Sequence, residues 1–175
     1  MQRRIEEERL KKLARRIDAL AEKDDRLIRK TREIAELRKG AAMQLHSICR
    51  GFVERVNSHL SRTSLDFSPP DYSPESFRNT GANLLQINVR GRILQIEFNA
   101  TETLVSTENF RVPYIVEGAV RSFNQDYLDR DIVEEQLLFF CLERRANLWR
   151  FFDARTYRTG LFDSEYLAAL MDQMV

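Results

Sequence analysis

The sequence contains little of what marks a disulfide framework or a membrane span: only two cysteines among its 175 residues, and no long apolar run. Cys49 and Cys141 lie far apart, so they predict free thiols of a reducing compartment. No stretch of about 18 apolar residues occurs, which excludes a spanning helix and a membrane partner. The first residues have no apolar segment typical of a secretory signal, so we expect a cytoplasmic protein.

Residues for catalysis or metal binding are also few. The glycines are isolated, so no glycine-rich phosphate loop is present. His46, Cys49 and His59 are the only cluster of metal-ligand types, but Cys49 completes an apolar helical pattern and no second Cys or His pair exists. With both histidines on one predicted helix, a nucleophilic triad is not expected. We therefore expect no metal, no cofactor and no enzyme. The alternative is an enzyme with a carboxylate site in a cleft between residues 61–83 and the predicted sheet.

An acidic run precedes the C-terminal third of the chain. It lacks the glycine and the ligand spacing of a calcium loop, so it predicts a solvated connection, with hard-cation binding as the alternative. Its members are Asp126, Asp129, Asp131, Glu134 and Glu135.

The charged residues divide the chain near residue 40. Residues 1–39 carry a net charge of +5 and all five lysines, whereas residues 40–175 carry −4. Between Arg3 and Lys39 there is no glycine or proline, and Ala, Leu, Glu, Lys and Arg dominate, as in a strong helix. We predict a charged amphipathic helical arm over 1–40 and an α+β domain over 41–175.

The arm has a heptad repeat with one apolar row and one interrupted row. With Leu10 at position a, every d position is apolar, while Asp24 and Thr31 interrupt the a row. This pattern predicts a coiled-coil-like surface for an oligomer or another protein. The predicted interface residues are Leu10, Leu13, Ile17, Leu20, Leu27 and Ile34.

The flanking heptad positions bear on the orientation of a homodimer. Position g is always basic and position e is never charged; the residues are Arg9, Arg16, Lys23 and Lys30 at g, and Ala14, Ala21, Ile28 and Ala35 at e. In a parallel pair g faces e′ without penalty, whereas in an antiparallel pair g faces g′ and like charges repel. Small e residues favour close antiparallel packing, so the two arguments oppose each other, and the parallel form is slightly preferred.

The length of the arm favours a partner from another chain. A helix of about 37 residues is roughly 55 Å long, whereas the rest would form a globule under about 40 Å across. Part of the apolar stripe would then lie beyond the domain. A homodimer is the first expectation; a different protein subunit and folding back onto the domain are the alternatives.

The second region begins with another amphipathic helical face, from Leu45 to Leu60, of the kind that covers a sheet. Whether Gly40 separates it from the arm is left open. Residues 61–83 hold three of the four prolines and predict a loop, ordered as a strap because aromatic residues recur in it.

The rest of the chain predicts an antiparallel sheet of about five to six strands. Residues 84–90 and 94–99 alternate as a hairpin around Gly91, and short strands are expected at 104–107 and 112–123, where Pro113 and Gly118 suggest an edge or a bulge. Residues 136–143 and 148–158 are apolar on both faces and predict a second hairpin, with a helix starting at Asp131 as a competitor. A short C-terminal helix, capped by Asp163 or Ser164, and the helix after residue 40 would cover the sheet. If both lay on one face, the other face would be a subunit interface.

Arginines interleaved with Trp149, Phe152 and Tyr157 on the second hairpin give the alternative function, nucleic-acid binding by stacking and phosphate contacts. The candidate contacts are Arg144, Arg145, Arg150, Arg155 and Arg158. The competing explanation is an exposed sheet edge on which arginines pair with Glu143 and Asp153. The sequence therefore favours a non-enzymatic interaction protein.

Overall fold

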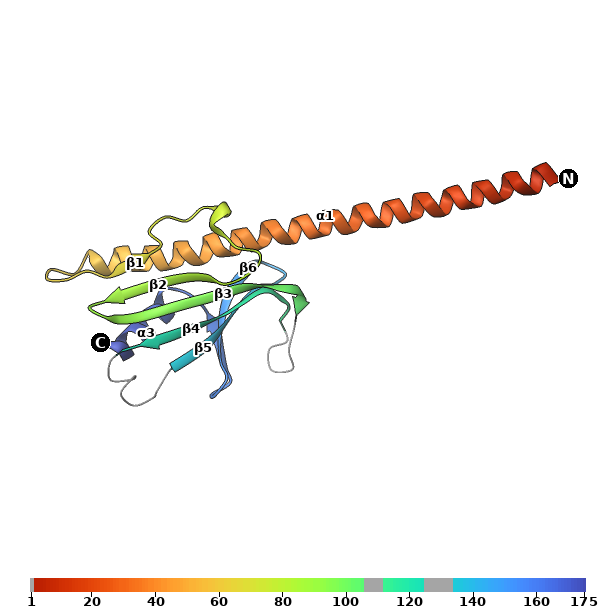
Figure 1. The fold of residues 1–175 in the computed structure, drawn as a ribbon. Coiled ribbons are helices and arrows are strands. Elements are labelled where there is room, and N and C mark those ends of the chain that lie inside the picture. Colours follow the sequence, from red (N-terminus) through yellow and green to blue (C-terminus); the bar gives the residue numbers. More distant parts are fainter. Residues whose placement is uncertain (1, 106–111, 125–133) are drawn as a thin grey trace. The chain divides into compact units, whose positions relative to one another are not determined.

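A computed structural model describes residues 2–105, 112–124 and 134–175. It is an α+β fold with one long helix, a seven-stranded antiparallel sheet and a short C-terminal helix (Figure 1). The helices are α1 (Gln2–Asn57) and α3 (Ser164–Met174), with a 3₁₀ turn η1 (Pro74–Ser76). The strands are β1 (Asp66–Ser68), β2 (Asn83–Val89), β3 (Arg92–Val105), β4 (Tyr114–Phe123), β5 (Glu134–Leu142), β6 (Asn147–Asp153) and β7 (Arg158–Leu161).

The chain divides into two compact units, residues 1–37 and 38–175. The first unit is helix throughout its described length and carries no glycine or proline that would interrupt it. Gly40 does not end the helix, so the arm and the amphipathic face that follows it, whose separation the sequence leaves open, form one continuous α1. The favourable propensity of the flanking Ala, Leu, Lys and Arg outweighs the roughly 1 kcal/mol that a single helical glycine costs.

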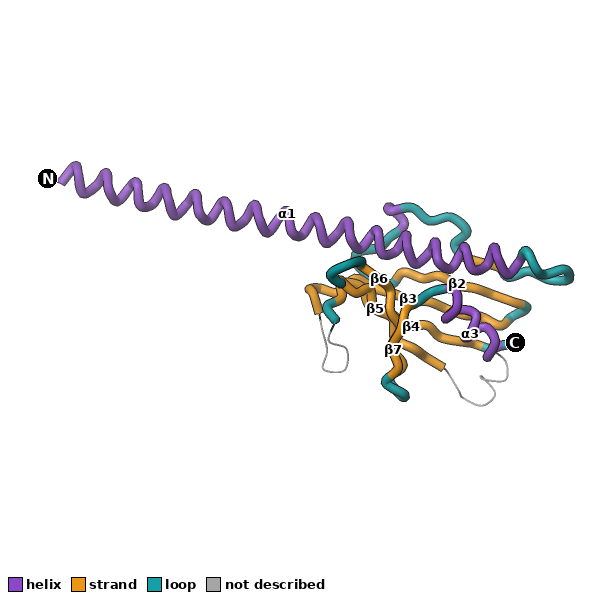
Figure 2. Tube along the Cα trace, turned by 180° about the vertical axis from the view of Figure 1, so that it is seen from behind, coloured by secondary structure: helices purple, strands orange, loops and turns teal. Residues whose placement is uncertain are grey.

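The second unit is built on a meander, because the seven strands follow one another in space as they do in sequence (Figure 2). Every neighbouring pair is antiparallel. Arg90 and Gly91 both have positive φ and form the two-residue turn between β2 and β3, as the twist of a hairpin favours. The strand number is seven and not five to six, because short β1 and β7 extend the sheet at its two edges.

One face of the sheet is covered by both helices. The Trp149 indole N–H donates a hydrogen bond to the Ala41 carbonyl of α1 at 2.8 Å. Two residues along β6, on the same face, the ring of Phe151 stacks on Tyr166 of α3 at 4.2 Å. The core under the helices is completely buried and includes Leu45, Leu85, Ile87, Leu94, Ile96, Phe98 and Leu138.

The opposite face carries a smaller apolar cluster among charged side chains. Tyr114, Phe139, Cys141 and Phe152 are buried there, and the first two rings lie 4.4 Å apart. Strands β5 and β6 are therefore apolar on both sides, as predicted. Because these large side chains are already buried, they give no reason to expect a subunit interface on this face.

Arg38 connects α1 to an irregular part of the sheet. The β3–β4 register shifts between Ala100 and Val105, and the β4–β5 register shifts between Tyr114 and Val116. Arg38 Nε donates to the Ile115 carbonyl at 3.1 Å, and Nη2 donates to the Thr101 carbonyl. The guanidinium thus bonds backbone carbonyls at the two places where the ladder is irregular.

Several predicted elements need correction. Leu104 belongs to the long strand β3 and not to a separate strand; residues 106 and 107 lie outside the described residues. Gly118 pairs in register with Phe98 and Leu138 in the interior of the sheet, so it marks neither an edge nor a bulge. A Cβ at this position would lie 2.2 Å from the Glu97 carbonyl oxygen, which is why glycine is needed there.

Other predictions are confirmed. Residues 134–142 form strand β5, so the helical alternative is wrong for this segment. Asp163 is the N-cap of α3, and its carboxylate accepts a hydrogen bond from the Tyr166 amide at 2.9 Å. The strap at 61–83 is ordered, with Phe67 in β1 and Phe77 buried.

Candidate self-association surface

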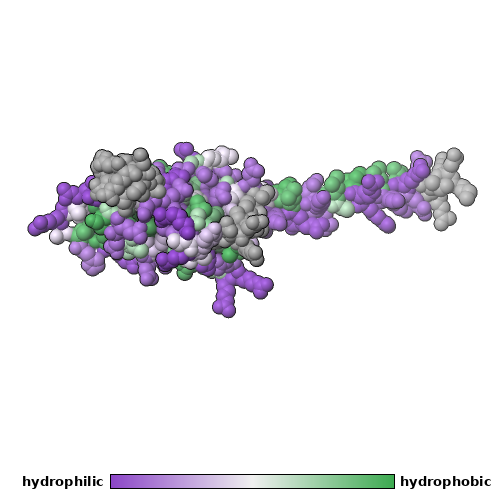
Figure 3. Space-filling model, turned by 90° about the horizontal axis from the view of Figure 1, so that it is seen from below, coloured by the Kyte–Doolittle hydropathy of each residue, from purple (hydrophilic) through white to green (hydrophobic). Residues whose placement is uncertain are grey.

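The first helical unit exposes an apolar stripe along one side of the helix. Figure 3 shows apolar side chains gathered along one side of the helix and charged side chains along the other. Six large apolar side chains of this unit are at least half exposed: Leu10 (58%), Leu13 (51%), Ile17 (56%), Leu20 (59%), Leu27 (64%) and Ile28 (50%). Exposed apolar surface of this kind is typical of interaction sites, so the stripe is a candidate for such a site.

The structure places most of the predicted interface residues together. Leu10, Leu13, Ile17, Leu20 and Leu27 are exposed on the stripe, while the sixth predicted residue, Ile34, is half-buried. Ile28 was missing from the predicted set. Its heptad position e was the available signal, because a large apolar residue there widens the stripe beyond positions a and d.

Two polar residues interrupt the stripe in different ways. The Thr31 hydroxyl donates to the Leu27 carbonyl one turn earlier, at 2.9 Å, so it is satisfied within its own helix. Asp24 is exposed and has no hydrogen bond or ion pair to another described residue. Of the two, only Asp24 would bring an uncompensated charge into an interface.

The predicted nucleic-acid contacts do not form one patch. Arg144 and Arg145 lie at the corner before β6, whereas Arg155 and Arg158 follow β6. A seven-residue strand separates these ends by roughly 20 Å. The electrostatic surface is therefore split between the two ends of the hairpin.

Two of the arginines on this hairpin are engaged in ion pairs, and most of its aromatic rings are buried, so few of these side chains can contact a nucleic acid. Arg150 pairs with Glu143 through bonds of 2.5 and 3.1 Å, and Arg155 lies 3.7 Å from Asp153. Trp149 and Phe152 are buried, so among the aromatic residues named for stacking only Tyr157 is exposed. Nucleic-acid binding by this hairpin stays a prediction.

The histidine and cysteine side chains of α1 have structural surroundings. His46 Nε2 lies 2.9 Å from the Pro69 carbonyl oxygen, and its ring contacts those of Phe67 (4.9 Å) and Tyr72 (5.2 Å) in the strap. Cys49 is completely buried, and His59 is exposed beyond the helix end. No group of three potential metal ligands occurs within the described ranges.

Neither thiol is available as a thiolate nucleophile in the folded chain. Burial raises the pKa of Cys49, and burial followed by the nearby Glu143 carboxylate raises the pKa of Cys141 to about 12. Both cysteines are free. Protonated buried thiols are inert at neutral pH.

Of the predicted acidic run, Asp126, Asp129 and Asp131 lie outside the described residues. Glu134 and Glu135 begin strand β5, and Glu135 accepts a hydrogen bond from Arg121 Nε at 2.5 Å. Arg121 also lies 3.4 Å from Glu97 on the neighbouring strand β3. These two glutamates therefore belong to the sheet, and Glu135 is paired.

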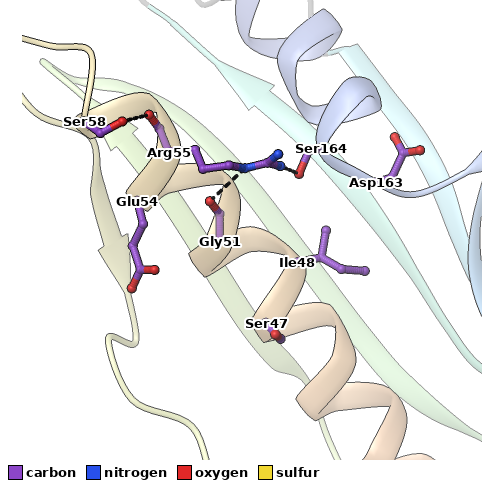
Figure 4. Close-up of a pocket in the computed structure, with 8 residues that line it drawn as sticks. All are labelled: Ser47, Ile48, Gly51, Glu54, Arg55, Ser58, Asp163 and Ser164. Atoms are coloured by element: carbon purple, nitrogen blue, oxygen red, sulfur yellow. Dashed lines mark hydrogen bonds between the residues drawn. The ribbon is translucent and has the colours of Figure 1, made fainter.

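A groove of about 640 Å³ lies between the last turns of α1 and the start of α3 (Figure 4). Arg55 crosses it, donating to the Ser164 hydroxyl and, at 3.4 Å, to the Gly51 carbonyl. Asp163 caps α3 through its bond with the Tyr166 amide. Arg55 and Asp163 are thus engaged in holding the helices, and Glu54, which also lines the groove, accepts a hydrogen bond from Arg50 at 2.8 Å.

The cavity beside the strap was the predicted place for a carboxylate site. It measures about 400 Å³ and is lined by Asp71, Tyr72, Arg78 and Asn83 among others. Asp71 is the single carboxylate among the described residues that line it. A pair of carboxylates with separated pKa values, as acid–base catalysis by such a site requires, is not assembled by these residues.

No family model, curated protein or solved structure matches this chain. Across the described part of the chain, no helix combines the length and apolar character needed to cross a membrane.

Proposed function

We propose that this protein is a non-enzymatic interaction protein that associates with a second copy of itself through residues 1–37 and presents its α+β domain in that assembly. The observation that carries the proposal is the set of six apolar side chains that are at least half exposed on one stripe of α1. Burying one Leu or Ile contributes roughly 1.5–3 kcal/mol. A second copy supplies an equal stripe, as an isologous twofold interface requires.

The same proposal holds that the protein catalyses no reaction, and the surroundings of its cysteines and of the strap cavity support this part. Both thiols are buried with raised pKa values, and Asp71 is the single carboxylate of the described strap cavity lining. A cytoplasmic location is also proposed, supported by two free cysteines that form no disulfide.

A pair of double variants of the full chain tests self-association. Leu13→Gln with Leu20→Gln removes apolar surface from the stripe, while the control, Lys12→Gln with Ala19→Gln, makes two substitutions to the same residue on the opposite side of the helix. Glutamine is a good helix former, so the helix is preserved in both. Light scattering is expected to give a dimer for the wild type and the control and a monomer for the Leu13/Leu20 variant. A monomeric wild type, or a dimeric Leu13/Leu20 variant, would contradict the proposal.

A further inference from the structure

We infer that the two helical units pair antiparallel, with the twofold axis beside Glu22; this rests on the proposed self-association. In an antiparallel pair, position a of one helix faces position d of the other. With the axis beside Glu22, Leu10 lies level with Ile34 of the second copy, and Ile17 lies level with Leu27. The apolar residues alternate at spacings of three and four residues in both chain directions, so the stripe of one helix can pack against the same stripe of a second helix that runs the opposite way.

Asp24 decides against the parallel arrangement. In a parallel pair each a residue faces its own copy, so two exposed Asp24 carboxylates would be brought together in the seam and desolvated. In the antiparallel pair Asp24 lies level with Leu20, and the two carboxylates are offset along the axis. Lys23 of the second copy then lies beside Asp24 and offers it an opposite charge.

Thr31 can enter the same seam without an unpaired donor. It lies level with Leu13 of the second copy in this register. Its hydroxyl already donates to the Leu27 carbonyl at 2.9 Å, so the side chain offers its methyl group to the partner. Of the two polar interruptions, therefore, only Asp24 distinguishes between the two orientations.

The e positions also fit the antiparallel pair, because e faces e′ in it. Ile28, which is half exposed, faces Ala14 of the second copy with an offset of two residues along the axis, and Ala21 lies beside its own copy next to the axis. A large residue thus meets a small one, and two small residues meet where the helices come closest. In a parallel pair Ile28 would instead lie beside the charged Lys23.

Repulsion between the basic side chains at position g opposes the antiparallel orientation, but these side chains are exposed to solvent. Arg16 would lie near Lys30 of the second copy, and Lys23 near its own copy. All three side chains are exposed in the isolated helix, and repulsion between exposed charges is small and screened by salt. Desolvation of two facing carboxylates is not screened in this way, so the Asp24 argument outweighs the g-edge argument.

Distance measurements between spin labels on the full chain test the orientation. Glu8→Cys and Glu22→Cys place labels at the same heptad position, f, away from the seam. The native Cys49 and Cys141 are completely buried, and the unsubstituted chain serves as the labelling control. At about 1.5 Å rise per residue, the two Glu8 sites are separated by roughly 40 Å along the axis in the antiparallel dimer, and the Glu22 sites lie level.

A long distance for the Glu8 variant together with a short distance for the Glu22 variant supports the antiparallel pair. Equal short distances from both sites would overturn the orientation while leaving self-association intact. Absence of any dipolar coupling from either site, with a monomeric mass, would overturn the proposed function as well. Loss of the coupling in a Glu22→Cys chain that also carries Leu13→Gln and Leu20→Gln is expected, since those changes remove the dimer.

Discussion

The two halves of α1 have similar apolar periodicity but different surroundings. Leu20, in the first half, is 59% exposed, whereas Leu45, in the second half, is completely buried under the sheet core. Leu20 lies between Ala19 and Ala21, and Leu45 has Ala41, Ala42 and Cys49 nearby, so small residues accompany both leucines. Helical periodicity therefore shows which side of a helix is apolar, whereas packing against the chain's own sheet determines which part of that side is buried.

The largest expected effect comes from the same substitution in the two halves. Leu45→Ala should lower the free energy of unfolding of the domain by about 2–5 kcal/mol, because it leaves a cavity in a closed core. Leu20→Ala should leave the unfolding of the domain nearly unchanged and weaken self-association instead. Urea denaturation followed by Trp149 fluorescence measures the first quantity. Equal destabilisation of the domain by both variants would contradict the separation of the two halves.

A second prediction concerns the residue at the start of the domain unit. Arg38→Met should lower the free energy of unfolding by about 1–3 kcal/mol, since it removes one hydrogen-bond donor from each of the Thr101 and Ile115 carbonyls. Arg32→Met, at an exposed position of the first unit, is the matched control and should have little effect. An unchanged urea midpoint for Arg38→Met would show that these bonds add nothing to the fold.

A third prediction concerns pH and the ion pair on the uncovered face of the sheet. The hydrogen bond from Arg150 lowers the pKa of Glu143 below its ordinary value, with burial opposing it. The folded state therefore releases this proton more readily than the unfolded state. The contribution is present above the ordinary carboxyl pKa and is lost as the pH falls through the lowered folded pKa.

Glu143→Gln should accordingly cost about 1 kcal/mol at neutral pH, as for a partly exposed charged hydrogen bond. The difference from the wild type should shrink in acid, and unfolding midpoints measured across the acid range check this. A difference that is the same at neutral and acid pH would show that the pair does not contribute through its charge.

The smallest expected effect is a stabilisation by a substitution at Gly40, close to the junction of the two units in the sequence. Gly40 lies within α1, and a Cβ added there would meet nothing within 4 Å. Gly40→Ala should therefore raise helix stability by about 0.5–1 kcal/mol. Thermal unfolding followed by circular dichroism measures this effect. The same substitution at Gly118 is the contrasting variant: it would place a Cβ 2.2 Å from a carbonyl oxygen and should destabilise the chain.

Much of the fold could be predicted from local patterns. The hairpin of β2 and β3 follows from alternating apolar residues around Gly91, and α3 follows from Asp163 before an apolar helical pattern. The short strands β1 and β7 were missed, because three or four residues are too few to give a strand signal. Pairing with a neighbouring strand, and not local sequence, makes them part of the sheet.

Residues whose role depends on distant contacts could not be predicted. Arg38 occupies a heptad position in the sequence pattern, yet its partners are carbonyls at Thr101 and Ile115, far along the chain. Trp149 was considered for stacking on bases, whereas its ring is buried and its N–H bonds to Ala41. The exposed stripe was predictable, because heptad spacing alone defines it.

The central claim, that residues 1–37 carry self-association, is tested most directly by comparing two chains in solution. One is the full chain, and the other begins at Arg38, so that the bonds of its guanidinium to the sheet are retained. Light scattering over a range of concentrations should give a dimer for the full chain and a monomer for residues 38–175. Equal monomer masses for both chains, or a dimer that survives removal of the first unit, would contradict the claim.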